Sequence, residues 1–449
     1  MEEPFLLAAS YYFYMCWEPV YALLLLSSTV VTYVASLAMV RWRDRAKIVM
    51  LGSIAVNLGI LFFYKYYEFA AQTITDIMGS CGMSIDVPHF TLLLPVGISF
   101  YTFQAMGYAI DVYRGDVKAE RNFFTYALFV SFFPQLVAGP IERSTNLLQQ
   151  FHEKRQFSGR AAIQGVHLML WGFFLKLAVA DRAALYVDEV FNHMDAANGG
   201  SALLASILFC FNLYGDFAGY SYIAIGCAKV MGFDLMSNFR RPYFFSASVQ
   251  DFWKRNHISL TTWFMDYVYY PLVGSSINLY WWCFCIFFTF FLSGFWHGAA
   301  WTYVVSFSIF GIYLVVCVLK DKAQRSFEKK HQLKKKEWWL WLNRIATFIL
   351  VMLALVFFRA NSISDGMCCI GKIFSSLAIP DTLGKIRYWL LLSGSLGILF
   401  IGEYIVEYKK FAVTESNFFK AYTSVDSCLL LLILLLGVFD GEQFIYFQF

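Results

Sequence analysis

Long apolar segments alternate with short polar ones along most of the chain. A helix that crosses the hydrocarbon core of a bilayer needs about 20 mainly apolar residues, and several segments approach that length. The shorter segments are typical of tilted, re-entrant or interfacial helices. The pattern therefore predicts an all-α bundle of about ten membrane spans around a central tunnel, formed by a single membrane domain over residues 1–449. The apolar segments are residues 5–14, 21–40, 48–64, 90–110, 123–137, 161–179, 203–231, 281–292, 301–319, 338–358, 388–405 and 428–438.

The composition supports a membrane protein. Hydrophobic residues make up 59% of the chain and charged residues only 15%, whereas soluble domains carry about 25% charged residues. Aromatic residues reach 20%, which suits membrane interfaces and close helix packing. We therefore expect the lipid bilayer as a partner and expect no nucleic acid.

Basic residues gather in two loops, at residues 41–47 and 320–336. The positive-inside rule places both clusters on the cytoplasmic side. Each is interpreted as a topology anchor, with binding of acidic lipid or of CoA phosphates as the alternative. The chain opens without a basic n-region, so we expect no cleavable signal peptide.

Polar residues interrupt two of the apolar segments. Residues 132–143 contain two prolines and a glycine, and non-helical backbone at membrane depth is tolerated only against protein or water. This segment therefore predicts a cavity wall. Asp216 interrupts the longest apolar segment and needs a cationic partner, for which Arg240, Arg241 and Arg255 are candidates.

Two histidines, His257 and His297, lie on either side of the apolar segment 281–292. An ionisable residue at membrane depth is costly and is a functional-site candidate by default. Imidazole also transfers protons readily near neutral pH. The structural alternatives are a histidine hydrogen-bonded inside a helix bundle for His297 and a polar contact that fixes a re-entrant helix for His257.

Several common catalytic motifs are missing from the sequence. It has no HExxH, P-loop or GxGxxG string and no GxSxG nucleophile elbow. Its ten cysteines form no recurring CxxC pair, which argues against a zinc or disulfide framework. We therefore expect no metal and no tightly bound cofactor, and no motif indicates a covalent intermediate.

Distinctive strings occur in order along the chain. They are FPQLVAGPIER at 133–143, GFFLKLAVADR at 172–182, DFAGYS at 216–221, NFRRPY at 238–243, FWKRNHISL at 252–260, GFWHGAAW at 294–301 and VFFRA at 356–360. In these strings the chain resembles the membrane-bound O-acyltransferase family and, more narrowly, the membrane subunits of bacterial alginate O-acetyltransferases. Asn256 departs from the family pattern, which usually has an aromatic residue there.

The resemblance implies a multi-pass enzyme of the bacterial cytoplasmic (inner) membrane. It would take acetyl from cytosolic acetyl-CoA, the acyl donor substrate, and deliver it to a hydroxyl of an extracytoplasmic polysaccharide, cell-wall polymer or partner protein. In the family this step commonly uses an extracytoplasmic partner of SGNH-hydrolase type. The resemblance makes His297 the principal catalytic residue, and we expect it to act as general base on the acceptor hydroxyl.

The residues around His257 suggest a supporting role. We expect His257 to orient the donor or to support His297. Lys254 and Arg255 are expected to meet the phosphates of acetyl-CoA, because cations at a pore mouth raise the local anion concentration. A solvated basic edge is the structural alternative for this pair.

Two other functions remain open from the sequence. The first is transfer of D-alanine from a carrier protein to teichoic acid, which would need a docking surface for the carrier. The second is a transporter or channel, but transporters often carry repeated halves with paired broken helices, and the sequence shows no such repeat.

Overall fold

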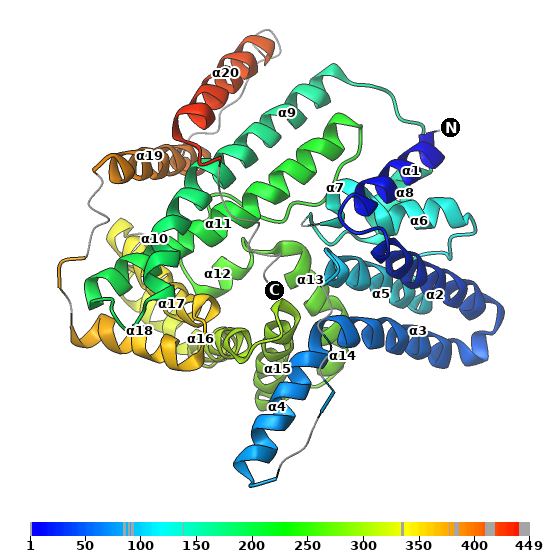
Figure 1. The fold of residues 1–449 in the computed structure, drawn as a ribbon, viewed down its shortest axis with the longest axis horizontal. Coiled ribbons are helices and arrows are strands. Elements are labelled where there is room, and N and C mark those ends of the chain that lie inside the picture. The colour runs from blue at the N-terminus through cyan, green and yellow to red at the C-terminus, as the bar shows by residue number, and fades with distance from the viewer. Residues whose placement is uncertain are drawn as a thin grey trace. The chain divides into compact units, whose positions relative to one another are not determined.

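The structure, a computed structural model, describes residues 2–83, 87–88, 90, 94–137, 139–333, 336–376, 378–380, 386–408 and 418–439. Every regular element in these ranges is a helix, which confirms the all-α prediction (Figure 1). The chain forms two compact units. The first comprises Met1–Ala162 and Cys227–Met236, and the second comprises Ile163–Gly226 and Ser237–Phe449.

The first unit is built mainly from the N-terminal third of the chain. Short 3₁₀ and π turns join several of its helices. Its elements are α1 (Glu2–Met15), α2 (Tyr21–Arg41), η1 (Arg43–Arg45), α3 (Ala46–Leu61), η2 (Phe62–Tyr66), α4 (Tyr67–Ser80), α5 (Ile98–Arg114), α6 (Phe123–Ser131), α7 (Phe133–Leu136), η3 (Ser144–Leu148) and α8 (Gln149–Phe151).

The second unit carries both histidines. It includes most of α9 and α11, whose outer ends belong to the first unit. Its elements are α9 (Gly159–Phe173), η4 (Phe174–Ala180), α10 (Asp181–Asn192), α11 (Gly199–Val230), α12 (Val249–Trp253), α13 (Ile258–Phe264), η5 (Met265–Tyr269), α14 (Tyr270–Val273), α15 (Leu279–His297), α16 (Trp301–Lys330), α17 (Glu337–Arg359), α18 (Ile363–Ser375), α19 (Ile386–Tyr408) and α20 (Phe418–Leu436).

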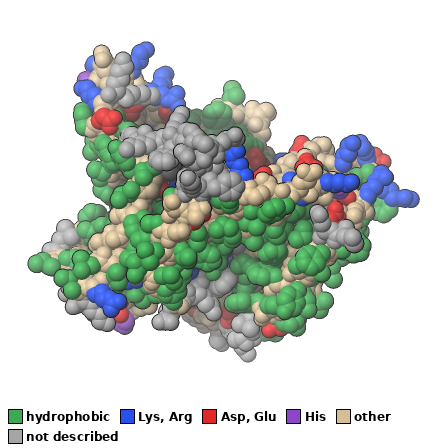
Figure 2. Space-filling view, turned by 90° about the horizontal axis from the view of Figure 1, so that it is seen from above, with side chains coloured by type: hydrophobic (Ala, Val, Ile, Leu, Met, Phe, Trp, Pro, Cys, Tyr) green, Lys and Arg blue, Asp and Glu red, His purple; other side chains and the backbone are tan. Residues whose placement is uncertain are grey.

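The described residues contain 8 helical runs that are long and apolar enough to cross a membrane. This number is close to the approximate count that the sequence predicts, and it supports a multi-pass membrane protein. Many apolar side chains on these helices are exposed, as expected for a surface that faces lipid. Figure 2 shows hydrophobic side chains spread continuously over much of the drawn face, with lysines and arginines gathered in separate patches.

The predicted apolar segment 123–137 is not one helix. Asn122 caps α6, with its side chain accepting a hydrogen bond from the backbone N–H of Phe124 at 3.0 Å. The helix ends at Ser131, and α7 then begins with Pro134 in its first turn. Proline is tolerated there because the first-turn N–H has no intrahelical acceptor. The helix therefore breaks where the sequence predicts.

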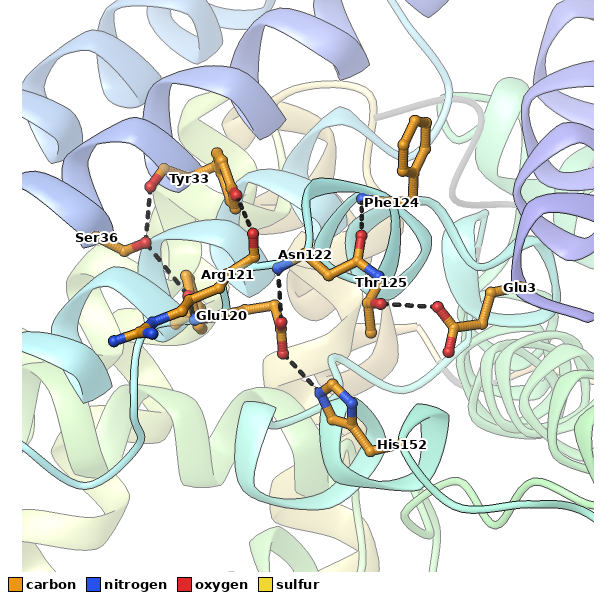
Figure 3. A network of polar contacts seen from close by, with 10 residues as sticks. Glu3, Tyr33, Ser36, Glu120, Arg121, Asn122, Phe124, Thr125 and His152 are labelled. Atoms are coloured by element: carbon orange, nitrogen blue, oxygen red, sulfur yellow. Dashed lines mark hydrogen bonds and ion pairs between the residues drawn. The ribbon is translucent and has the colours of Figure 1, made fainter. Parts of the chain in front are cut away.

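A polar network ties the loop before α6 to its neighbours in the first unit (Figure 3). The carboxylate of Glu120 lies 2.6 Å from Nε2 of His152 and accepts the backbone N–H of Asn122 at 2.8 Å. The hydroxyl of Tyr33 donates to the carbonyl of Arg121 at 2.6 Å. These contacts satisfy the polar backbone of a loop between apolar helices.

In the second unit, α9 and α11 run side by side at close range (Figure 1). A Cβ at Gly172 would lie 2.5 Å from the carbonyl oxygen of Gly219, so only glycine allows this approach.

Next to this contact, Nζ of Lys176 lies 2.6 Å from Asp216 and 2.7 Å from Asp181. Asp216 is thus paired with a lysine from η4. The sequence left three arginines open as partners of Asp216 and did not include Lys176, which precedes it in the chain.

Candidate active site

One pocket of the second unit contains both histidines. Its cavity volume is about 30 Å³, and the ring centroids of His257 and His297 lie 6.0 Å apart. The walls are largely aromatic and come from α11, α12, α16, α17 and the chain before α12. The other lining residues are Leu213, Tyr214, Phe217, Phe239, Tyr243, Phe252, Trp253, Asn256, Phe307, Phe310, Leu355 and Phe358.

His297 is the last residue of α15 and is 4% exposed. Its ring stacks on Phe307 with centroids 4.3 Å apart and meets the edge of Phe358 at 5.6 Å. Aromatic rings from α16 and α17 therefore fix the orientation of this imidazole.

The glycines beside His297 are required by packing. A Cβ at Gly294 would lie 2.8 Å from Cα of Val304 on α16, so α15 and α16 could not pack as closely. A Cβ at Gly298 would overlap the ring of Tyr303. Both glycines let the chain turn tightly from α15 to α16, and this turn holds His297 against Phe307.

His257 is buried and sits just before α13, with φ of 44° and ψ of 51°. A left-handed conformation is uncommon for a residue with a side chain and is found at functional sites. The amide of Asn238 holds this turn. Its Oδ1 lies 3.2 Å from Nδ1 of His257 and accepts from the hydroxyl of Ser259 at 2.9 Å. Its Nδ2 donates to Ser221 on α11 at 3.1 Å.

These contacts define the tautomer of His257. Because Asn238 donates to Ser221 through Nδ2, its Oδ1 is the acceptor that faces Nδ1 of His257. The neutral ring therefore carries its proton on Nδ1, which leaves Nε2 as the basic nitrogen. Burial lowers the pKa of His257 well below its usual range. His257 is thus neutral at physiological pH.

The two basic residues before His257 differ in their surroundings. Lys254 is exposed. Arg255 is partly buried, and its Nε donates to Asp251 at 3.0 Å while its Nη1 donates to the carbonyl of Pro242 at 2.7 Å. Neither residue lines the pocket. Arg255 therefore links Asp251 to the carbonyl of Pro242, whereas the side chain of Lys254 is open to solvent.

Two further charged residues have clear partners. Glu142, in the first unit, accepts hydrogen bonds from Nδ2 of Asn146 at 2.8 Å and from the backbone N–H of Met236. Burial raises the pKa of Glu142 to about 7. Arg359 pairs with Asp188 at 2.6 Å. A carboxylate on α10 therefore holds the guanidinium of Arg359 at the end of α17.

Sequence reasoning missed the role of Asn238. It lies in the string NFRRPY, which was noted only as part of the family resemblance. A buried asparagine after an apolar helix could have indicated a hydrogen-bonding centre, but its partners Ser221 and His257 could not be identified from spacing. Asn256 does line the pocket, at the position where the family usually has an aromatic residue.

No metal centre can be assembled from the described side chains. Among them, no group of three or more histidines, cysteines, aspartates or glutamates is placed to hold a metal ion. The chemistry available in the pocket is that of two imidazoles beside aromatic walls.

Known proteins resemble this chain over much of its length. A model described as "MBOAT, membrane-bound O-acyltransferase family" matches residues 117–364, a range that contains both histidines. The probable alginate O-acetylase AlgI of Pseudomonas aeruginosa is 37% identical over 80% of this chain and 67% of its own length. The peptidoglycan O-acetyltransferase of Helicobacter pylori is 29% identical over 99% and 91%. The teichoic acid D-alanyltransferase of Bacillus subtilis is 27% identical over 71% and 77%.

Proposed function

Because this chain belongs to the membrane-bound O-acyltransferase family, we propose that it transfers acetyl from cytosolic acetyl-CoA to a hydroxyl group outside the cytoplasm. The acceptor is an extracytoplasmic polysaccharide, a cell-wall polymer or a partner protein. Relatives named as alginate and peptidoglycan O-acetylating enzymes support this choice. The observation that carries the proposal is the pair of histidines, whose ring centroids lie 6.0 Å apart in one pocket.

In the proposed reaction His297 is the general base. The hydroxyl oxygen of the acceptor attacks the carbonyl carbon of the thioester, the new C–O bond forms, and the C–S bond breaks. The proton of the hydroxyl moves to His297 and then to the departing thiolate sulfur, so no other co-reactant is needed. The stacking of His297 on Phe307 supports this role because it fixes the plane of the ring.

His257 supports the reaction in this proposal. Its neutral ring and its hydrogen bond to Asn238 fit a group that orients the donor or steadies the imidazolium of His297. Lys254, which is exposed, is proposed to attract the phosphates of acetyl-CoA. Arg255 contributes to the same basic edge while it also holds Asp251.

The test replaces His297 with alanine and measures the transfer of labelled acetyl from acetyl-CoA in isolated membranes. Loss of a general base typically lowers the rate by about 10²- to 10⁴-fold. His193→Ala is the matched control, because His193 is exposed just after α10, where its Nδ1 contacts the carbonyl of Glu189. A His297→Ala protein that inserts normally and transfers acetyl at the wild-type rate would refute the assignment.

A second acyl donor deserves a direct comparison. Relatives named as teichoic acid D-alanyltransferases favour the alternative of D-alanyl transfer from a carrier protein. Membranes are supplied with labelled acetyl-CoA in competition with a D-alanyl-loaded carrier. Label that reaches polymer from acetyl-CoA and is not displaced by the carrier supports acetyl transfer, and the reverse supports the alternative.

We also propose that the enzyme lies in the bacterial inner membrane and hands acetyl to an SGNH-type partner outside the cytoplasm. Reconstitution decides this point. If labelled acetyl accumulates on polymer only when an exported SGNH-type protein is present, the partner is required. If the enzyme acetylates polymer by itself, this part of the proposal is wrong.

A further inference from the structure

A buried carboxylate on α19 lies beside the histidine pocket. Glu403 is 0% exposed. Its Oε1 accepts a hydrogen bond from the hydroxyl of Tyr214 at 3.3 Å, and its Oε2 accepts the backbone N–H of Tyr243. An ionisable residue inside a membrane helix is costly and marks a functional position by default. The guanidinium of Arg241 interacts electrostatically with this carboxylate and offsets part of that cost.

Both partners of Glu403 are walls of the pocket. The rings of Tyr214 and Tyr243 stack with centroids 4.3 Å apart and planes inclined by 16°. Tyr214 also meets the edge of Phe239 at 5.7 Å. One carboxylate thus fixes two neighbouring aromatic rings through its two oxygens.

The segment that ends at Tyr243 begins at the residue that holds His257. Asn238 bonds the imidazole of His257, and the backbone N–H of Arg240 donates to the carbonyl of Arg255 at 3.0 Å. Glu403 fastens the far end of the same short segment at Tyr243. The position of His257 therefore depends on a segment that is held at both ends.

The placement of α19 is set by close packing. A Cβ at Gly402 would lie 3.0 Å from the indole ring of Trp171 on α9, so glycine allows α19 to approach at this level. The guanidinium of Arg241 covers the ring of Trp171 at 5.2 Å. Residues 386–408 lie outside the range 117–364 that the family model matches, so the family comparison assigns no role to Glu403.

We propose that Glu403 is a positioning residue for acyl transfer. It acts through Tyr214 and Tyr243 to fix the positions of the pocket wall and of His257. This inference rests on the proposed acyl transfer. Replacing Glu403 should therefore lower kcat more than it changes the affinity for the donor, because Glu403 contacts residues of the pocket wall but does not itself line the pocket.

The experiment is a double-mutant cycle on Glu403 and Tyr214. Glu403→Gln keeps one carbonyl oxygen for the backbone N–H of Tyr243, while its Nε2 can only donate to the hydroxyl of Tyr214, so the O–H of Tyr214 loses its acceptor. We expect it to lower kcat about ten- to hundredfold, since small misplacements of reacting groups cost that much, with KM for acetyl-CoA unchanged. In a Tyr214→Phe background only the backbone donor remains, so the same change should cost less than about threefold if the two residues act as a unit.

A matched control separates this role from general stability. Glu328 is also a buried glutamate, on α16, and it accepts a hydrogen bond from Gln324 at 2.8 Å. Glu328→Gln should leave kcat unchanged. Hydrogen exchange of peptides that cover residues 238–245 supplies a readout without activity, and we expect faster exchange there in Glu403→Ala and not in Glu328→Gln.

The outcomes are distinguishable. If Glu403→Gln keeps wild-type kcat, or if its effect multiplies fully with that of Tyr214→Phe, the positioning role is refuted while acyl transfer stands. If KM rises and kcat does not fall, Glu403 supports donor binding and the proposal is also wrong. If the wild-type protein transfers no acetyl from acetyl-CoA, the proposed function fails, and the exchange measurement still decides whether Glu403 holds the segment.

Discussion

Replacing Asn238 with alanine removes the amide that links α11, the turn at His257 and the start of α13. In the wild-type protein this side chain is 0% exposed. Its Oδ1 accepts from the hydroxyl of Ser259 at 2.9 Å and from its backbone N–H at 3.3 Å, and it faces Nδ1 of His257 at 3.2 Å. The variant leaves these buried donors without that acceptor.

The magnitude follows from the number of donors that lose their partner. A buried polar group left without a hydrogen bond costs about 1–3 kcal/mol. The hydroxyl of Ser259 can rotate toward another acceptor, so the backbone N–H of Ser259 and the ring of His257 account for most of the loss. We therefore expect Asn238→Ala to lower the free energy of unfolding by about 4 kcal/mol, the middle of the range of about 2–6 kcal/mol for two such groups.

The catalytic effect should be separate from this loss of stability. His257 in the variant can turn about its side-chain bonds, and we expect kcat to fall by about ten- to hundredfold. The assay measures labelled acetyl transfer in nanodiscs well below the unfolding temperature of the variant. Ser237→Ala is the matched control, because Ser237 lies in the same segment but donates only to the carbonyl of Phe239 at 2.8 Å.

Two results would contradict this reasoning. A folded Asn238→Ala protein with wild-type kcat would show that the orientation of His257 does not matter to the reaction. An equal loss of kcat in Ser237→Ala would show that the whole segment, and not the amide of Asn238, is responsible.

The remaining predictions concern buried charge, pH and the donor. Lys176→Met leaves two buried carboxylates without their cation and should destabilise the protein by about 3–5 kcal/mol; an unchanged melting temperature in detergent would refute the pairing with Asp216 as a stabilising contact. Burial lowers the pKa of His257 well below its usual range, so below pH of about 6.5 the unfolded chain binds a proton that the folded chain does not, and stability should fall by up to about 1.4 kcal/mol per pH unit. His257→Gln should remove that part of the slope, as measured by unfolding between about pH 5.5 and about pH 7.5, one unit either side of the ordinary pKa of histidine. An identical slope in both proteins would count against this prediction. Lys254→Ala should raise KM for acetyl-CoA several-fold at constant kcat. If the double variant with Arg255→Ala binds acetyl-CoA with unchanged affinity, these two residues do not bind the donor.

The sequence was sufficient for the elements that depend on local pattern. Apolar segments of helical length predict most of the long helices, and Pro134 marks the break after α6, because hydrocarbon burial and proline geometry act on neighbouring residues. The two histidines could also be singled out, since an ionisable group beside a long apolar segment is conspicuous. The structure brings them into one pocket.

Partners that are distant in the sequence could not be predicted. For Asp216 the sequence offered only arginines that follow it as possible partners, whereas Nζ of Lys176 on η4 lies 2.6 Å from its carboxylate. Glu403 lies 160 residues after Tyr243, whose N–H it accepts, and no periodicity relates them. Such pairs form because helix packing brings them together, and a single sequence contains no record of that packing.

The aromatic wall of the histidine pocket has a consequence for the fate of the donor between turnovers. The side formed by Phe307, Phe358 and Trp253 offers few polar groups to a water molecule, which needs two to four polar neighbours to settle in a protein. In the proposed acetyl transfer, a thioester that rests against this side would be shielded there from hydrolysis until an alcohol arrives. An enzyme of this construction should waste few activated acyl groups when its acceptor is scarce.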